Sequence, residues 1–233
     1  MRKEAVILAG GLGTRLKNVL QDTPKPMAAV RNRPFLEYIL EKLINFKFDK
    51  VVLSVGHLHE VIINHFGSRY KSLDIDYMIE DSPLGTGGAL VKSISKVETN
   101  EIFVLNGDTY FDIDFDVLSL NHGSSLCIAL KNIVDASRYG SVAISPAGFV
   151  TDFKEKESGL SGFINGGIYL VKSDIFKNLK IIEEKFSFES FIKKYYKSLC
   201  ARAEVFEQPF IDIGVPEDYN LAEKFFESIY LEN

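Results

Sequence analysis

The 233-residue sequence predicts one α/β domain, residues 1–233, built on a Rossmann-like, doubly wound sheet that is mixed but mainly parallel. Through the first half of the chain, short apolar runs alternate with stretches of helical periodicity, which is the pattern of βαβ units and a parallel sheet. The second half holds short strand-like runs joined by Gly, Pro and Ser, which indicates mixed or antiparallel strands added to that sheet. A chain of this length can bury a full core, and no linker or repeat divides it.

The first predicted strand begins at Ala5 and runs directly into the glycine-rich segment Gly10 to Leu16. Apolar runs bounded by Gly are typical of buried strands. Glycines after a strand let backbone N–H groups close on an anion because no Cβ stands in the way, and the planar cation of Arg15 suits phosphate oxygens. The stretch therefore predicts a nucleotide phosphate site at the carboxyl end of the first strand.

Lys25 stands between two prolines, Pro24 and Pro26. Proline restricts its own φ and the conformation of the residue before it, so we expect Lys25 on a stiff, extended segment that positions its ammonium group. Beyond this segment, a helix is predicted to begin with Pro34 at its first position and to end at Phe46.

The remaining elements follow from the spacing of apolar residues. In the first half we expect strands over 50–55, 75–79 and 101–106 and helices over 58–66 and 85–94. In the second half we expect strands over 125–130, 141–145, 149–153 and 163–171, with helices over 187–197 and 216–230. Ligands bind at the carboxyl ends of the strands in such sheets, so the glycine segment, Glu80 and Asp108 should converge.

Composition excludes several classes of function. The net charge of −5 argues against a nucleic-acid partner, whereas the basic excess of residues 1–33 suits a small polyanionic ligand. No apolar run approaches the roughly 20 residues of a membrane span, and no signal peptide precedes the first strand, so we expect a cytoplasmic protein with no membrane partner. Cys127 and Cys200 have no metal-site or disulfide spacing and are predicted to be inert core residues.

Two common glycine-loop motifs do not fit this sequence. The dinucleotide-binding fingerprint G-x-G-x-x-G would place glycine where Leu16 stands, and it needs an acidic residue at the end of the second strand, which instead ends at Gly56. The phosphate loop of NTPases needs Gly-Lys-Ser/Thr, a tripeptide that the sequence does not contain.

The glycine segment Leu8–Leu16, followed by Pro24–Met27, resembles the sugar-phosphate nucleotidylyltransferases. The match continues in chain order through Gly85–Gly88, Asn106–Asp108, Glu155–Lys156, Asn165–Tyr169 and Asp212–Pro216. The resemblance implies a GT-A-like nucleotidyltransferase fold, with residues up to about 123 binding the nucleotide and residues from about 124 to 233 binding the sugar phosphate. It also implies the reaction: an NTP and a sugar 1-phosphate give an NDP-sugar and pyrophosphate by in-line attack on the α-phosphate.

This reaction needs no general base, because a phosphate monoester loses its second proton at a pKa of roughly 6 and attacks as an anion. No catalytic role is therefore given to the four histidines, His57, His59, His65 and His122. The reaction does need charge stabilisation at the α-phosphate. The resemblance implies that Arg15 holds the leaving pyrophosphate, and that Lys25 neutralises charge at the α-phosphate or bridges to the sugar phosphate.

The resemblance also implies a Mg²⁺ ion held by Asp108 and Asp212. Mg²⁺ typically takes one or two carboxylates plus ligand phosphates, and a carboxylate among the apolar neighbours of Asp212 is costly unless it is paired or metal-bound. Without the resemblance, two other interpretations are possible: Asp108 could lie in an ordinary turn, and Asp212 could cap the helix that follows it. The family often has threonine where this chain has Val215, which removes a hydroxyl group but not the metal role.

The ligand sites implied by the resemblance form two sets. Nucleotide contacts fall on Leu8, Gly10, Gly11, Gly13, Thr14, Glu80, Gly85, Thr86 and Gly88. Sugar-phosphate contacts fall on Gly140, Glu155, Lys156, Asn165 and Gly166. The Glu80 carboxylate can accept from both N1–H and N2–H of guanine, which favours GTP, although glutamate also stands near here in relatives that use other nucleotides. A solvated Glu80 and a surface Lys156 are the alternatives.

Within the family, three segments are most similar to the guanylyltransferases that act on D-glycero-α-D-manno-heptose 1-phosphate, namely Pro24–Ala28, Arg33–Tyr38 and Gly162–Tyr169. The implied product is GDP-heptose for a capsule or other surface polysaccharide. The alternatives are a uridylyl- or cytidylyltransferase for a hexose or amino-sugar 1-phosphate, a catalytically silent nucleotide-sugar sensor, and a glycosyltransferase on a related sheet. Near the C-terminus, an apolar group either closes the core or forms a homodimer contact: Phe225, Phe226 and Ile229.

Overall fold

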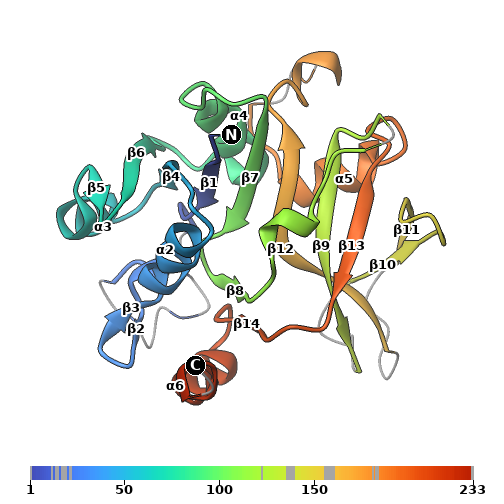
Figure 1. Cartoon of the computed structure of the whole chain (residues 1–233). Coiled ribbons are helices and arrows are strands. Elements are labelled where there is room, and N and C mark those ends of the chain that lie inside the picture. The colour runs from blue at the N-terminus through green and yellow to red at the C-terminus, as the bar shows by residue number, and fades with distance from the viewer. Residues whose placement is uncertain are drawn as a thin grey trace.

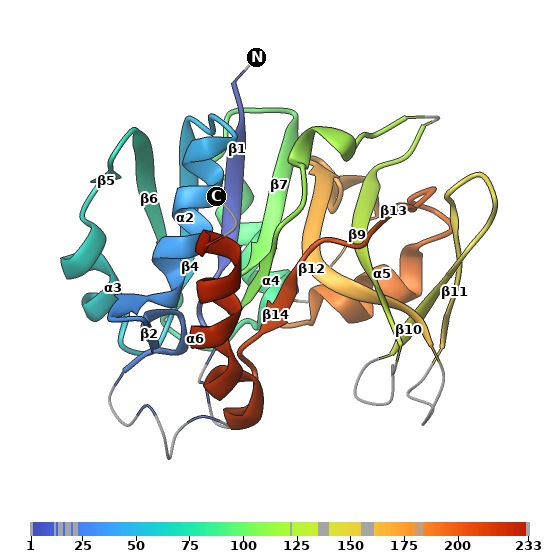
Figure 2. The ribbon, with the colours of Figure 1, turned by 60° about the horizontal axis from the view of Figure 1, so that its bottom comes forward.

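A mixed sheet of ten strands forms the centre of the part of the chain that the computed structural model describes (Figure 1). That part comprises residues 2–11, 13, 16, 20, 23–121, 123–134, 140–154, 161–179, 181 and 184–231. Both halves of the chain contribute strands to this sheet, and helices cover both of its faces (Figure 2). The prediction of a mixed, doubly wound α/β sheet is therefore confirmed.

The first half of the chain forms the parallel centre of the sheet from β1 (Glu4–Leu8), β4 (Lys50–Val55), β6 (Leu73–Ile79) and β7 (Glu101–Asn106). β1 pairs in parallel with both β4 and β7, and β4 pairs in parallel with β6. The register places Leu8 opposite Ser54 on one side and Asn106 on the other. The carboxyl ends of three strands therefore meet in one row, and the chain that follows each strand contributes to the same site.

The second half adds strands to the free side of β7. β12 (Gly162–Lys172) runs antiparallel to β7, β9 (Leu126–Ile133) runs antiparallel to β12, and β13 (Arg202–Phe206) runs parallel to β9. A hairpin of β10 (Ser141–Ile144) and β11 (Val150–Lys154) lies at the edge of the sheet beside β12. The predicted mixture of strand directions in this half is confirmed.

The helices lie on two faces of the sheet, and each face has its own hydrophobic core. One core contains side chains of α2 (Phe35–Asn45), α3 (His59–Phe66) and α6 (Pro216–Leu231), and the other contains side chains of α4 (Gly85–Ile94) and α5 (Phe188–Tyr195). Figure 2 shows α2 and α6 in front of the sheet and α4 and α5 behind it. β1 serves both cores, because its successive side chains point to opposite faces.

The C-terminal helix α6 completes the first core. Phe226 is fully buried and stacks on Tyr38 with ring centroids 3.9 Å apart, and Phe225 and Ile229 pack partly buried against the same core. These side chains therefore close the core of their own chain. A homodimer remains a prediction.

Short elements account for most of the differences from the expected structure. Pro34 is not the first helical residue: it lies in β3 (Arg33–Pro34), which pairs with β2 (Ala29–Val30), and α2 begins after it. The helix expected from residue 58 begins at His59, because Leu58 has a left-handed φ of 59°. Within the described ranges, the remaining short strands are β5 (Arg69–Tyr70), β8 (Thr109–Phe111) and β14 (Phe210–Asp212). The 3-10 helices given bounds there are η2 (Lys25–Met27), η3 (Phe115–Val117) and η4 (Lys177–Leu179).

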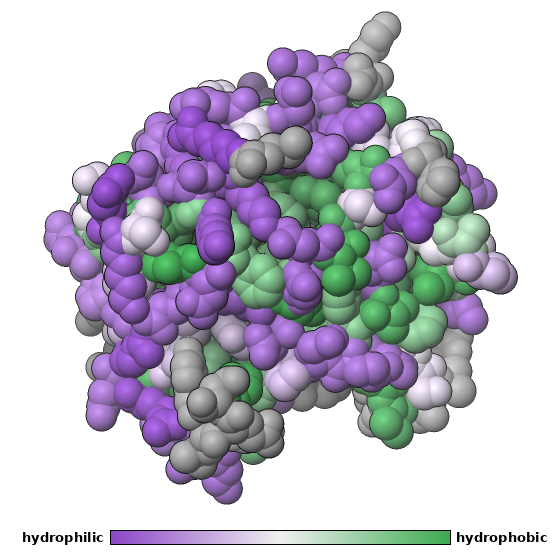
Figure 3. Space-filling model, viewed as in Figure 1, coloured by the Kyte–Doolittle hydropathy of each residue, from purple (hydrophilic) through white to green (hydrophobic). Residues whose placement is uncertain are grey.

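Hydrophilic side chains cover most of the face shown in Figure 3, with apolar side chains mainly at its centre. Among the described helices, none combines the length and apolarity that a membrane crossing requires. Cys127 is buried as predicted, but the prediction for Cys200 was wrong, because Cys200 is exposed in a left-handed turn with φ 46°.

Candidate active site

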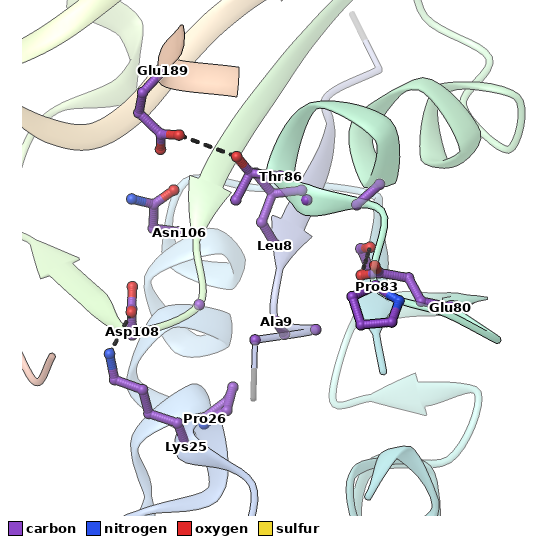
Figure 4. A pocket seen from close by; sticks show the side chains of 16 residues that line it. Leu8, Ala9, Lys25, Pro26, Glu80, Pro83, Thr86, Asn106, Asp108 and Glu189 are labelled. Carbon is purple, nitrogen blue, oxygen red and sulfur yellow. Dashed lines mark hydrogen bonds and ion pairs between the residues drawn. The ribbon is translucent and has the colours of Figure 1, made fainter. Parts of the chain in front are cut away.

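A cavity of about 330 Å³ lies where the carboxyl ends of β1, β4 and β7 meet (Figure 4). Eight of the residues singled out from the sequence line it: Leu8, Gly10, Gly11, Lys25, Glu80, Gly85, Thr86 and Asp108. The other lining residues are Ala9, Pro26, Ser54, Pro83, Ala89, Asn106, Gly107 and Glu189. The expected convergence of the glycine segment, Glu80 and Asp108 is therefore observed in the described part of the chain.

The positions after β1 are occupied by glycine for different physical reasons. A Cβ added to Gly10 would lie 2.2 Å from Glu80 Oε1, so this glycine lets the carboxylate approach the backbone. Gly13 has a left-handed φ of +59°, which favours glycine. A Cβ on Gly11 would meet no atom of the described residues within 4 Å, so contacts within this part of the chain do not require glycine there. Thr14 and Arg15 lie outside the described residues.

Lys25 and two carboxylates form one charged cluster. Lys25 Nζ donates to Asp108 Oδ2 at 2.5 Å. Asp212 lies opposite Thr109 in the β14–β8 pair, and a Cβ on Gly214 would lie 2.7 Å from Asp212 Oδ1 and 3.5 Å from Lys25 Nζ. The chain thus brings Asp212 beside Lys25 and Asp108, although Asp212 is not part of the cavity lining.

The local structure of this cluster differs from expectation in two respects. Lys25 does not lie on an extended segment: Pro24 is extended, and Lys25 is the first residue of η2. Asp212 Oδ1 accepts a hydrogen bond from Gly214 N–H at 2.6 Å. Because α6 begins only at Pro216, this hydrogen bond does not cap the helix. The two prolines still fix the position of Lys25, because Pro26 is buried within the 3-10 turn.

The carboxylates of the cluster repel one another. Burial, followed by the negative charge of Asp108, raises the pKa of Asp212 to about 6, while the Lys25 ammonium acts in the opposite direction. Two carboxylates held together, of which Asp108 lines the cavity, form a donor set that suits a hard divalent cation. The described residues contain no group of three or more His, Cys, Asp and Glu side chains that could hold a metal ion. A cation here would therefore need ligand phosphates to complete its coordination.

Glu80 provides a carboxylate at the other end of the cavity. Leu84 N–H donates to Glu80 Oε2 at 3.0 Å, and Ser54 Oγ lies 3.5 Å from Glu80 Oε1. Burial raises the pKa of Glu80, so the side chain is not the solvated glutamate that the sequence left as an alternative. Its carboxylate faces a cavity and is held from two sides.

The glycines of the Gly85–Gly88 motif mainly admit another part of the chain. A Cβ on Gly87 would lie 2.2 Å from the Phe186 ring, and one on Gly88 would lie 2.2 Å from the Glu184 carbonyl oxygen. Gly85 has φ +70°, and a Cβ on it would lie 2.5 Å from the Phe186 carbonyl oxygen. Gly85 and Thr86 line the cavity, whereas Gly88 is buried under the chain preceding α5.

Of the residues expected to bind the sugar phosphate, the three that the structure describes do not line this cavity: Gly140, Asn165 and Gly166. Asn165 Nδ2 donates to the Tyr169 hydroxyl at 2.6 Å, and its Oδ1 accepts from Gly167 N–H at 3.0 Å, so both ends of the amide hold the bulge in β12. Gly166 leaves room for the Phe111 ring, which a Cβ would approach to 2.5 Å. Gly140 is exposed at the start of β10. Glu155 and Lys156 lie outside the described residues.

Three polar side chains of the lining were not expected from the sequence. Ser54 and Asn106 end their strands in register with Leu8, and the position of Asn106 two residues before Asp108 was a usable signal. Glu189 comes from the first turn of α5, and its Oε2 accepts from Thr86 Oγ1 at 3.1 Å. No local pattern marks Glu189, because only the fold brings it to the cavity.

Comparison with known proteins agrees with this geometry. The family described as Nucleotidyl transferase matches residues 4–228. The D-glycero-alpha-D-manno-heptose 1-phosphate guanylyltransferase of Campylobacter jejuni subsp. jejuni serotype O:2 is 50% identical over 216 residues, which cover 93% of this chain and 96% of the relative. The protein of the same description from Aneurinibacillus thermoaerophilus is 43% identical over 225 residues, covering 95% and 97% of the two chains. The crystal structure of HddC from Yersinia pseudotuberculosis complexed with GMP-PN has a TM-score of 0.82, 35% identity and coverage of 96% of this chain and 99% of that chain.

Proposed function

The chain belongs to the nucleotidyl transferase family, and we propose that it transfers the guanylyl group of GTP to D-glycero-α-D-manno-heptose 1-phosphate, releasing GDP-heptose and pyrophosphate. The observation that carries the proposal is the arrangement of the cavity. A held carboxylate, Glu80, lies at one end, and Lys25 and Asp108 lie on the opposite side with Asp212 beside them. The two heptose 1-phosphate guanylyltransferases that align with nearly the whole of this chain support the choice of substrates.

Glu80 supports the choice of guanine. An ionised carboxylate accepts hydrogen bonds only, and guanine presents N1–H and N2–H side by side as two donors. Uracil presents one ring N–H between two carbonyl oxygens, which a carboxylate would repel. Because Leu84 and Ser54 hold Glu80 in place before the ligand arrives, selection costs little reorganisation.

Lys25 supports the transfer step. The attacking group is the acceptor phosphate, which is an anion near neutral pH, so the chain must reduce repulsion between two polyanions rather than remove a proton. Lys25 is the only cationic side chain in the described lining of the cavity. We infer that its ammonium stabilises negative charge on the α-phosphate as the bond to pyrophosphate breaks. Arg15 and Thr14 are proposed to contact the leaving phosphates.

Asp108 and Asp212 are proposed to hold Mg²⁺. Their carboxylates come from separate elements and meet beside Lys25. Burial and the negative charge of Asp108 raise the pKa of Asp212, and a bound cation would offset this cost. When bound, Mg²⁺ neutralises phosphate charge and orients the substrate phosphates. Asp108 lies on the side of the cavity opposite Glu80 (Figure 4).

The finer assignments are proposals of the same kind. We propose that residues up to about 123 bind the nucleotide and that the second half binds the sugar phosphate, with contacts from Gly140, Glu155, Lys156, Asn165 and Gly166. We also propose that the protein acts in the cytoplasm, and that GDP-heptose supplies a capsule or other surface polysaccharide.

A panel of pyrophosphate-release assays tests the proposal. GTP, UTP and CTP are each combined with D-glycero-α-D-manno-heptose 1-phosphate, mannose 1-phosphate and glucosamine 1-phosphate in the presence of Mg²⁺. The highest kcat/KM is expected for GTP with the heptose 1-phosphate. Equal or faster release with UTP or CTP and a hexose or amino-sugar phosphate would favour the uridylyl- or cytidylyltransferase. Absence of release in every combination, with nucleotide-sugar binding in calorimetry, would favour the sensor.

A further inference from the structure

Glu189 is the one lining residue of the cavity that comes from beyond residue 123 in the described chain. It lies on the side opposite Glu80, with Asn106 and Asp108 following it along the same wall (Figure 4). The cavity therefore has a carboxylate at each end, one from each half of the chain. Glu80 faces the proposed guanine position, which leaves Glu189 at the end available to the second substrate.

Glu189 is fixed in place by contacts between α4 and α5. Its Oε2 accepts from Thr86 Oγ1 at 3.1 Å and from Ser187 Oγ at 2.7 Å. Thr86 Oγ1 in turn accepts from Phe188 N–H at 2.8 Å. The Phe186 carbonyl accepts from Gly87 N–H at 2.9 Å, which ties the same segment to α4. This network orients the Glu189 carboxylate toward the cavity without a ligand.

Asn106 provides a second acceptor beside Glu189. Its Oδ1 is buried and has no hydrogen-bond partner among the described residues. A buried amide oxygen without a donor is unfavourable, so a donor from a ligand would be stabilising there. The amide nitrogen is packed against Gly167, where a Cβ would approach Nδ2 to 2.9 Å.

The chemistry of this end of the cavity favours hydroxyl groups. A carboxylate and an amide oxygen both accept hydrogen bonds, and a carboxylate repels a phosphate. Glu189 Oε2 already accepts from Thr86 and Ser187, so hydroxyl groups on adjacent carbons of a sugar would donate to Oε1, which offers two acceptor sites. The phosphates belong instead near Lys25, which is the only cation in the described lining.

We propose that Glu189 binds adjacent hydroxyl groups of the acceptor sugar, with Asn106 Oδ1 accepting from a further hydroxyl, so that the start of α5 selects the acceptor. This inference rests on the proposed function for the identity of the acceptor. It assigns sugar recognition to Glu189 and Asn106, which the sequence did not indicate as sugar-binding residues. The sugar-binding residues that the sequence did indicate do not line the cavity where the structure describes them.

Steady-state kinetics of Glu189→Gln test this inference, with Glu184→Gln as the matched control. Glu184 is an exposed glutamate of the same segment whose side chain does not line the cavity. Glu189→Gln should raise KM for the heptose 1-phosphate about 10- to 100-fold, as expected for loss of hydrogen bonds to a charged group, and leave KM for GTP within about threefold. Glu189→Asp, which keeps the charge on a shorter side chain, should give a smaller rise. The control should change neither KM.

Two results would overturn the inference. A rise in KM for GTP with an unchanged acceptor KM would place Glu189 in the nucleotide site. Unchanged values of both KM with a lowered Tm would make Glu189 a purely structural contact of Thr86 and Ser187. If the wild-type protein instead transfers guanylyl to another sugar 1-phosphate, the choice of heptose fails by itself, and the same variants are measured with that sugar, whose KM must then rise.

Discussion

Replacing Asp212 with asparagine is expected to stabilise the metal-free protein at neutral pH. Burial and the negative charge of Asp108 raise the pKa of Asp212 from 3.8 to about 6, although Lys25 opposes this change. In the unfolded chain Asp212 titrates near the lower value. The folded protein therefore holds this proton more tightly than the unfolded chain, and ionising Asp212 destabilises the fold.

The sign and size of the effect follow from proton linkage. Between the two pKa values the folded state keeps the proton that the unfolded chain has released, so stability falls as the pH rises through this range. At 1.36 kcal/mol per pH unit, the raised pKa of Asp212 lowers stability by about 3 kcal/mol at about pH 7.5 and by about 1.5 kcal/mol at about pH 5. Asparagine is neutral and keeps an oxygen that can accept from Gly214 N–H. For a chain of this size, about 3 kcal/mol corresponds to about 6–12 °C in Tm.

Thermal unfolding by circular dichroism, with a chelator present, measures this gain. The Asp212→Asn variant should melt above the wild type at about pH 7.5, and by roughly half as much at about pH 5. Asp152→Asn is the matched control, because Asp152 also accepts a backbone N–H, from Phe153 at 2.9 Å, but is exposed. An unchanged or lower Tm for Asp212→Asn at about pH 7.5, or an equal gain at both pH values, would refute the reasoning.

Further variants test the other parts of the site. Gly11→Ala should leave Tm within about 1 °C but weaken GTP binding in calorimetry. Gly88→Ala should instead lower the free energy of unfolding by about 1–3 kcal/mol, because its Cβ would lie 2.2 Å from the Glu184 carbonyl oxygen. The opposite pattern would contradict the roles given to these two glycines. Lys25→Met should reduce kcat about 10²- to 10³-fold in the pyrophosphate assay, and a kcat within about threefold of wild type would remove Lys25 from the transfer step. Glu80→Gln should reduce kcat/KM for GTP about 10-fold or more while changing that for UTP little, and an equal reduction for both nucleotides would separate Glu80 from base selection.

The parallel centre of the fold was predictable because its signals are local. The strands over 50–55 and 101–106 and the helix over 85–94 have the bounds that the sequence predicted, since continuous apolar runs and helical spacing mark buried strands and amphipathic helices. Strand ends in a parallel sheet share one edge. The positions of Glu80 and Asp108 in one cavity followed from that rule alone.

The contribution of the second half was not predictable, because it depends on contacts between distant segments. Thr86 and Glu189 are 103 positions apart and meet only because the chain before α5 packs on α4. The same packing explains Gly87 and Gly88, whose lack of side chains admits the segment from Glu184 to Phe186. In the sequence, these glycines look the same as glycines that admit a ligand.

Asn165 shows that residue type alone does not reveal which hydrogen bonds a side chain makes within the protein. Its amide follows the family pattern and has the right chemistry for a hydroxyl, but the structure uses both of its ends to hold the bulge in β12. A polar residue type can thus indicate a site while its hydrogen bonds are made within the protein. Hydrogen-bond partners, which only the fold supplies, distinguish the two asparagines. Asn165 Oδ1 accepts from Gly167 N–H, whereas Asn106 Oδ1 has no partner among the described residues.

Direct identification of the product tests the central claim. The purified protein is incubated with GTP, D-glycero-α-D-manno-heptose 1-phosphate and Mg²⁺, and the products are identified by mass spectrometry and phosphorus NMR. We expect GDP-heptose and pyrophosphate in equal amounts, with no product when Asp108→Asn replaces the wild type. Absence of GDP-heptose under these conditions, or a UDP- or CDP-sugar formed more efficiently from another sugar phosphate, would contradict the claim.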